Sequence, residues 1–218
     1  MKGECIMTDI EKLLATKIDA VKERVMNNTI LSKEEEEKDS EEAEKIISDF
    51  VFENPIVKFH NVNIDYKYLL MKVNSRVIFT VESNEGVILF VHGEKDGRVN
   101  LNNGAKVSYR DEAFIKQAEI EVGNKRVKKV HVISCYPGAK ESSWEVNGVR
   151  YINYGNELRP LQAAVKDGTL AISYTSKRQQ KFAEEELPML IMMSMKTSIT
   201  DPEMLAECQK WEEEHCNK

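Results

Sequence analysis

Two short apolar runs, residues 87–91 and 130–134, form the strongest hydrophobic pattern in the chain. Runs of Val, Ile, Leu and Phe bounded by glycine and charge are typical of strands buried on both faces, which need no polar alternation. Between the runs, residues 109–122 carry apolar side chains at helical spacing, and Gly123 supplies a helix stop. A helical crossover of this length joins parallel neighbours, so we expect both strands to end at one edge of a sheet.

The residues around this unit predict further strands. Runs rich in β-branched and aromatic residues place them at 56–62, 73–81, 144–153 and 169–174. The turn at residues 83–86 is too short for a crossover, so the strand before it should run antiparallel to the strand after it. Asn147-Gly148 predicts a hairpin turn, because both residues readily adopt positive φ. Residues 157–166 are predicted as a short helix.

Both ends of the chain carry helical periodicity. Thr8 and Glu11 match a capping box before an amphipathic helix at residues 9–26, and an acidic helix should begin near Ser32. Further helices are expected at 179–195 and 201–215. The fold class predicted from these patterns is α/β, with a mixed, largely parallel central sheet flanked by helices. Its expected parts are a helical, acidic extension (1–54), the α/β domain (55–196) and a C-terminal helix packed on that domain (197–218).

Composition narrows the range of partners. The 218 residues are 41% hydrophobic, which allows a sizeable core, and the formal net charge is −6. Scattered basic residues argue against a nucleic-acid partner, and the lack of a long apolar run argues against a membrane span. Four cysteines without framework spacing fit a reducing, cytoplasmic setting. The apolar face of residues 9–26 suits docking on its own domain, with a partner helix or a second copy as the alternative.

A histidine and a cysteine follow the two buried runs. His92 comes directly after the first run and Cys135 directly after the second. Because ligands of open α/β sheets bind at the carboxyl ends of the strands, we expect the two side chains to lie together in a site. A thiol beside an imidazole is the minimum apparatus for nucleophilic catalysis. His60 and His131 lie among strand residues and are predicted to be structural.

The sequence around this pair matches a known pattern. His92-Gly93 follows the first strand, a polar hairpin-like stretch occupies residues 98–104, and Ser134-Cys135-Tyr136-Pro137-Gly138 follows the second strand. Over residues 86–138 the chain resembles the caspase-like cysteine peptidases of clan CD, which include caspases, metacaspases, gingipains, clostripain and separase. The resemblance implies a caspase-like three-layer sandwich, a His-Cys dyad, and a peptide or protein substrate that is hydrolysed without a cofactor.

Several further residues receive candidate roles. The resemblance implies an oxyanion hole built from the backbone N–H groups of Gly93 and Cys135, and Asp96 or Glu94 is a candidate for orienting the imidazole. It also implies that the loop after strand 169–174 contributes to the specificity pocket, provided that this strand is parallel to the others. The candidate pocket residues are Tyr136, Ser173, Thr175, Ser176 and Arg178.

Other chemistries fit the sequence less well. A nucleophile elbow needs glycines two residues before and after the nucleophile, where this chain has Ile133 and Pro137. A cysteine phosphatase would need an arginine soon after Cys135. Metal-ligand spacing is incomplete, so no metal site is predicted. The two functions that remain are a cysteine endopeptidase, which could process itself, and a non-catalytic scaffold or regulatory module with a degenerate core that acts through residues 9–26.

Overall fold

The computed structural model describes residues 8–27, 29–75, 78–123, 127–137, 142–155 and 157–196, together with residues 202, 206 and 210. The chain divides into two compact units, one of residues Ser48–Thr175 and one of Met1–Ile47 with Ser176–Lys218. Among the residues named above, all strands lie in the first unit, and the elements of the second are helices. This division differs from the predicted organisation, since residues 176–196 group with the N-terminal helices.

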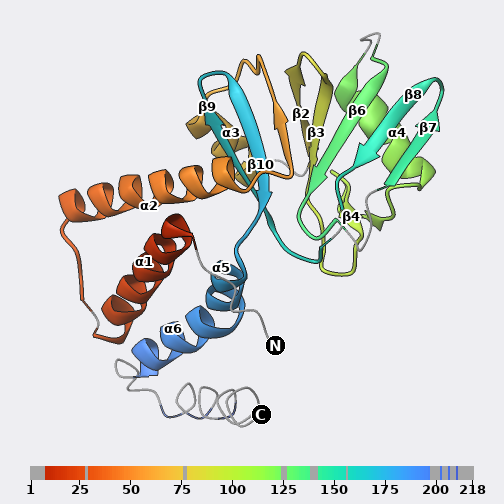
Figure 1. Ribbon diagram of the computed structural model, residues 1–218. Helices are drawn as coiled ribbons and strands as arrows, with labels where there is room; N and C mark the ends of the chain where they lie inside the picture. Colours follow the sequence, from red (N-terminus) through yellow and green to blue (C-terminus); the bar gives the residue numbers. More distant parts are fainter. Residues whose placement is uncertain are drawn as a thin grey trace, which may run out of the picture. The chain divides into compact units, whose positions relative to one another are not determined.

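A five-stranded mixed sheet forms the centre of the α/β unit (Figure 1). In spatial order its strands are β2 (Ile78–Ser83), β3 (Gly86–Val91), β6 (Lys129–Ser134), β8 (Val149–Asn153) and β7 (Ser142–Val146). The β3–β6 and β6–β8 pairs are parallel, and the β2–β3 and β8–β7 pairs are antiparallel. The predicted mixed sheet, the antiparallel entry strand and the Asn147-Gly148 hairpin are therefore confirmed. The sheet is not largely parallel as predicted, because only two of its four strand pairs are parallel.

The two faces of this sheet are covered differently. Helix α4 (Glu112–Val122) connects β3 to β6, as predicted, and its Phe114 and Ala118 pack on one face against Leu89 and Val130. Ile88 and its neighbours on the opposite face pack against a second sheet. Because β3 is covered from both sides, Leu89 and Ile88 are both fully buried, and each contributes about 1.5–3 kcal/mol of hydrophobic stabilisation.

The second sheet is a three-stranded antiparallel layer in the order β1-β10-β9. Its strands are β1 (Val57–Phe59), β10 (Thr169–Tyr174) and β9 (Leu161–Lys166). Strand β10 is confirmed, but it lies outside the five-stranded sheet and is antiparallel to both neighbours. The parallel arrangement on which the predicted role of the following loop depended is therefore absent.

Strand β9 corrects the helix predicted for residues 157–166. Asp167 and Gly168 both have positive φ, 50° and 69°, and form the tight turn that pairs β9 with β10. Leu161, Ala163 and Val165 alternate along β9 and pack against the core between the two sheets. The hairpin turn and the packing of this face of β9 against the core outweigh the helical composition of the segment.

Helix α3 (Tyr66–Ser75) corrects the strand predicted to begin at residue 73. The carboxylate of Asp65 accepts a hydrogen bond of 2.7 Å from the Lys67 N–H and so caps the start of the helix. Leu69 of α3 is fully buried in the core between the two sheets. A local cap and one core anchor therefore select a helix, and strand β2 begins only at Ile78.

The helical unit confirms several predictions made for the chain ends. Helix α1 (Asp9–Met26) has the predicted bounds and a complete Thr8–Glu11 capping box, and helix α2 (Lys33–Glu53) begins after Ser32. Helix α5 (Lys177–Lys181), a π-helical segment (Phe182–Glu186) and helix α6 (Leu187–Lys196) follow the α/β unit in sequence. The helix predicted at 201–215 lies outside the described residues, apart from 202, 206 and 210.

Ion pairs join the helices of this unit. Asp39 of α2 pairs with both Lys17 and Arg24 of α1, and Leu14 and Ile18 of α1 are buried. Helix α1 also packs on α6, as expected for a helix docked within its own chain. None of the helices in the described part of the chain is both long and apolar enough to span a membrane.

Candidate active site

His92 and Cys135 occupy adjacent positions at the carboxyl edge of the five-stranded sheet. Val91 of β3 is in parallel register with Ser134 of β6, and each strand ends at that residue. The next residue on β3 is His92, which is exposed, and the next on β6 is Cys135, which is a partly buried free thiol. In the described part of the chain, no hydrogen bond joins the two side chains. The topology brings the predicted pair to one edge of the sheet.

Gly93 brings the two strand ends into close backbone contact. A Cβ at this position would lie 1.8 Å from the Cys135 carbonyl oxygen and 3.2 Å from the Ser134 Cβ. Only glycine leaves room for that approach. After Gly93 the chain folds back and pairs with residues 98–100, through hydrogen bonds from the Glu94 N–H to the Arg98 oxygen and from the Asn100 N–H to the His92 oxygen. Neither bond uses the Gly93 N–H.

The Cys135 thiol lies in a desolvated environment. Burial raises its pKa above the ordinary value for cysteine, and a hydrogen bond from the Leu161 N–H to the sulfur works in the opposite direction. The net direction is upward. The thiol is therefore protonated at neutral pH, and a nucleophilic role requires a base that removes its proton.

The chain turns sharply immediately after Cys135. Tyr136 has a φ of 49°, in the left-handed region that non-glycine residues rarely adopt. The turn is held by a 3.0 Å hydrogen bond from the Tyr136 N–H to the Arg159 oxygen and by a 3.1 Å bond from Asn153 Nδ2 to the Pro137 oxygen. Backbone strain of this kind is concentrated at functional sites, and here it directly adjoins the candidate nucleophile.

A buried tyrosine supports the end of β6. The Tyr109 hydroxyl is hydrogen-bonded to Ser134 Oγ, and both residues are buried. Burial raises the pKa of Tyr109 to about 12, and the nearby Cys135 sulfur contributes in the same direction. The hydroxyl therefore stays protonated at neutral pH. Sequence patterns did not single out Tyr109. It precedes α4 in the chain, and it reaches the end of β6 only in the folded structure.

A pocket of about 280 Å³ opens next to this strand end. It is lined by Tyr109, Arg110, Pro137, Ser142, Trp144 and Asn153, with Gly97 and Ser108 completing the wall. Pro137 belongs to the turn after Cys135, and Gly97 to the loop after His92. The pocket thus lies between the segments that follow the two candidate catalytic residues. The hairpin predicted at residues 144–153 supplies Trp144 and Asn153 to this wall.

The two carboxylates proposed to orient His92 have other partners. Glu94 accepts a 2.7 Å hydrogen bond from Asn100 and pairs with Lys106 at 3.0 Å. Asp96 pairs with Arg98 at 2.6 Å. These bonds lower the pKa of both carboxyls and stabilise the loop around β4 (Val99–Asn100) and β5 (Lys106–Val107). Neither carboxylate is bonded to His92 in the described part of the chain.

The five candidate pocket residues have different surroundings. Tyr136 directly follows Cys135 in sequence, and the Thr175 N–H donates a 2.9 Å hydrogen bond to the Pro160 oxygen. Ser173 is buried and donates to the Asn54 oxygen at 2.6 Å. Ser176 caps α5, and Arg178 pairs with Asp19 and Glu186 inside the helical unit. None of the five lines the 280 Å³ pocket.

The other histidines of the α/β unit have structural partners. His131 is buried, donates from Nε2 to the Glu85 oxygen at 3.2 Å, and accepts at Nδ1 from the Tyr154 hydroxyl at 2.5 Å. Burial lowers the pKa of His131, which keeps it neutral. His60 bonds to the Thr169 hydroxyl at 3.2 Å. Among the described residues, no group of three or more His, Cys, Asp and Glu could hold a metal ion.

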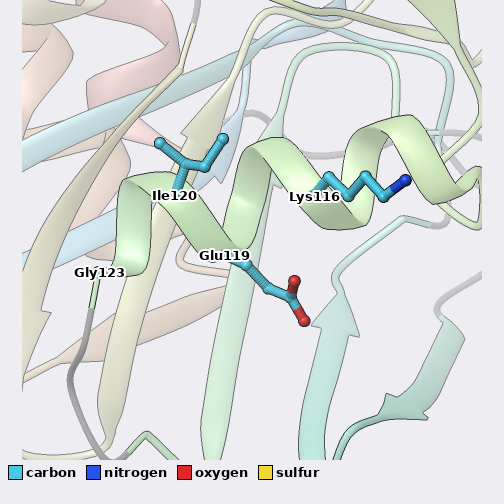
Figure 2. A pocket seen from close by; sticks show the side chains of 4 residues that line it. All are labelled: Lys116, Glu119, Ile120 and Gly123. Carbon is cyan, nitrogen blue, oxygen red and sulfur yellow. The ribbon is translucent and has the colours of Figure 1, made fainter.

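A second pocket lies on α4 and is lined by Lys116, Glu119, Ile120 and Gly123 (Figure 2). Ile120 and Glu119 point to different sides of the helix in this view. Ile120 is 72% exposed, and Glu119 accepts a 2.9 Å hydrogen bond from Asn147. These residues belong to α4, whose end leads into the start of β6, whereas Cys135 follows the end of β6. This pocket contains none of the candidate catalytic residues.

The geometry supports chemistry at one place, the edge where β3 and β6 end. It brings together a neutral thiol, an exposed imidazole, a tight backbone contact at Gly93 and a pocket of about 280 Å³. Such a set can attack a carbonyl carbon, provided that the imidazole takes the thiol proton. Comparisons with protein-family models, with curated proteins and with solved structures find no match to the chain.

Proposed function

We propose that the protein is a caspase-like cysteine endopeptidase in which Cys135 is the nucleophile and His92 the general base. The observation that carries this proposal is the parallel register of β3 and β6, which brings both residues to neighbouring positions at one sheet edge. Gly93 adds support, because its contact with the Cys135 carbonyl requires a glycine immediately after the histidine.

The reaction begins from a neutral thiol. His92 takes the proton from Cys135 as the sulfur forms a bond to the carbonyl carbon of the scissile peptide. The carbonyl electron pair moves to oxygen and then returns as the C–N bond breaks, and the imidazolium gives its proton to the leaving amine. Water, deprotonated by the same imidazole, then attacks the thioester, releases the acid and restores the thiol.

The backbone around Gly93 and Cys135 is suited to stabilise the oxyanion. The Gly93 N–H is not used in the two bonds that pair this segment with residues 98–100, and the chain turns sharply after Cys135 at Tyr136. Two backbone donors directed at the developing negative charge would lower the barrier without reorganisation. We assign this role to the N–H groups of Gly93 and Cys135.

The second candidate is a scaffold or regulatory module with a degenerate catalytic core. One observation favours it: burial raises the pKa of Cys135, which is the opposite of what an activated thiolate requires. In this case residues 9–26 would form the partner-binding helix. Leu13, 49% exposed on α1, is available to such a partner.

Replacement of the nucleophile separates the two candidates. We expect the wild-type chain to cleave members of a peptide library, or to process itself near Lys177-Arg178 or in the acidic part of α2, and Cys135→Ala to abolish every such cleavage. Mass spectrometry of library and chain after incubation measures both. Identical fragment patterns from wild type and variant would exclude the peptidase function and favour the scaffold or regulatory module.

A further inference from the structure

We infer that the 280 Å³ pocket binds a primary carboxamide, the side chain of a glutamine or asparagine residue. The inference rests on the proposed function, because the occupant would be the residue whose carbonyl Cys135 attacks. It is carried by two side-chain atoms of residues that line the pocket, Asn153 Oδ1 and Trp144 Nε1, which are buried and have no hydrogen-bond partner in the described part of the chain.

The hairpin of β7 and β8 brings these two side chains to the same wall. Ser142 is paired with Asn153, and Trp144 is paired with Tyr151. Residues two apart on a strand share a face, so Trp144 and Asn153 are diagonal neighbours on the pocket side. Trp144 is fixed by stacking on Tyr151, with ring centroids 5.6 Å apart and an interplanar angle of 8°.

Asn153 is held in a defined orientation. It is only 3% exposed, and its Nδ2 donates to the Pro137 oxygen at 3.1 Å. That bond identifies the other atom of the amide as an acceptor, so Oδ1 is left to receive a donor. Pro137 lies two residues after Cys135, which links the acceptor to the turn that carries the candidate nucleophile.

The unpaired atoms are one donor and one acceptor, and this combination selects the ligand. A primary carboxamide offers an N–H to Asn153 Oδ1 and a carbonyl oxygen to Trp144 Nε1. A carboxylate has only acceptors and would leave Oδ1 unpaired beside a negative charge. An ammonium or guanidinium group would find no carboxylate among the lining residues. An apolar side chain would leave both atoms unsatisfied, at a cost in affinity.

Arg110 is the one charged residue in the lining, and it is exposed. Solvent screens an exposed guanidinium strongly, so its attraction for an acidic side chain is small. The buried atoms therefore dominate the selectivity. Arg110 is suited instead to the peptide backbone of the same ligand at the rim of the pocket.

The test uses the full-length Cys135→Ala protein, so that binding is measured without cleavage. The probe is N-acetyl-glutamine N-methylamide, with the asparagine, glutamate and methionine analogues as comparators. A proton–nitrogen NMR spectrum reports the Trp144 indole N–H, which is distinguished from Trp211 by its loss in Trp144→Phe. We expect a saturable shift of the Trp144 signal with glutamine or asparagine, and at least about fivefold weaker binding of methionine and glutamate.

Two variants in the Cys135→Ala background identify the source of the selectivity. Trp144→Phe keeps an aromatic ring on Tyr151 but lacks the N–H, so the preference for glutamine over methionine, measured by calorimetry, should fall about fivefold. Ser142→Ala removes a lining hydroxyl that the inference does not use and should keep the preference. Thermal unfolding checks that both variants are folded.

Several results would overturn the inference. Equal or tighter binding of the glutamate analogue would indicate a carboxylate site governed by Arg110, equal binding of methionine would indicate an apolar pocket, and no shift of the Trp144 signal would indicate no carboxamide site. Carboxamide binding to a protein that cleaves no peptide would support the carboxamide site and contradict the proposed peptidase function. Cleavage without preference for glutamine or asparagine would support the peptidase function and contradict the carboxamide site.

Discussion

Gly93→Ala is expected to destabilise the protein by about 3 kcal/mol, at the upper end of what overpacking usually costs. The new Cβ would lie 1.8 Å from the Cys135 carbonyl oxygen, a distance that no side-chain rotation can relieve, because both atoms are fixed to the backbone. The backbone at Cys135 must therefore move. Chemical denaturation monitored by circular dichroism measures the loss of unfolding free energy.

The same substitution should reduce peptide cleavage by about 100-fold, since a displacement of about 1 Å in a catalytic group has an effect of that size. Gly104→Ala is the matched control. A Cβ at Gly104 meets no atom within 4 Å, although its φ of 84° is unfavourable for alanine. The control should lose about 1 kcal/mol of stability and none of its activity. Equal effects of the two substitutions would contradict the proposed contact.

His92→Ala is expected to lower the kcat/KM for peptide cleavage by about 100- to 10,000-fold, the usual contribution of general acid–base catalysis. The loss should be larger than in enzymes whose catalytic cysteine is already ionised, because burial keeps the Cys135 thiol neutral and leaves it dependent on a base. Steady-state kinetics on a peptide cleaved by the wild type measures it. The effect should appear mainly in kcat, since His92 acts on protons that move in the reaction.

His60→Ala provides the control for His92→Ala. Both histidines are exposed and belong to the α/β unit, but His60 bonds to Thr169 and lies away from the edge where β3 and β6 end. Its replacement should leave kcat/KM unchanged. A comparable loss of kcat/KM in both variants would indicate a general effect on folding. An unchanged kcat/KM in His92→Ala would show that His92 is not the general base.

The core of the fold was predictable because its strands are unambiguous in sequence. Residues 87–91 are apolar without interruption, and α4 between β3 and β6 has both helical spacing and a glycine stop. Strand β9 was not predictable in the same way. Its sequence, Leu161-Gln-Ala-Ala-Val-Lys166, is rich in helix formers, and only pairing with β10 makes it a strand.

The candidate site was predictable only where topology alone determines it. The positions of His92 and Cys135 follow from two parallel strands joined by one crossover. The environment of the thiol could not be read from the sequence, because it depends on burial and on a hydrogen bond from Leu161, which belongs to a different sheet. The pocket likewise combines side chains from separate loops and strands.

The central claim is that His92 activates the Cys135 thiol, and the pH dependence of Cys135 alkylation tests it most directly. Iodoacetamide labelling would be followed by mass spectrometry, which resolves Cys135 from Cys5, Cys208 and Cys216. Because burial raises the thiol pKa, the unassisted rate should keep rising beyond pH of about 8.5, the ordinary range for cysteine. At a pH of about 7 the wild type should be labelled faster than His92→Ala, because the imidazole takes the proton from the neutral thiol. The two rates should converge at high pH, where the thiol ionises without help, and superimposable profiles for the two proteins over the whole pH range would contradict the account.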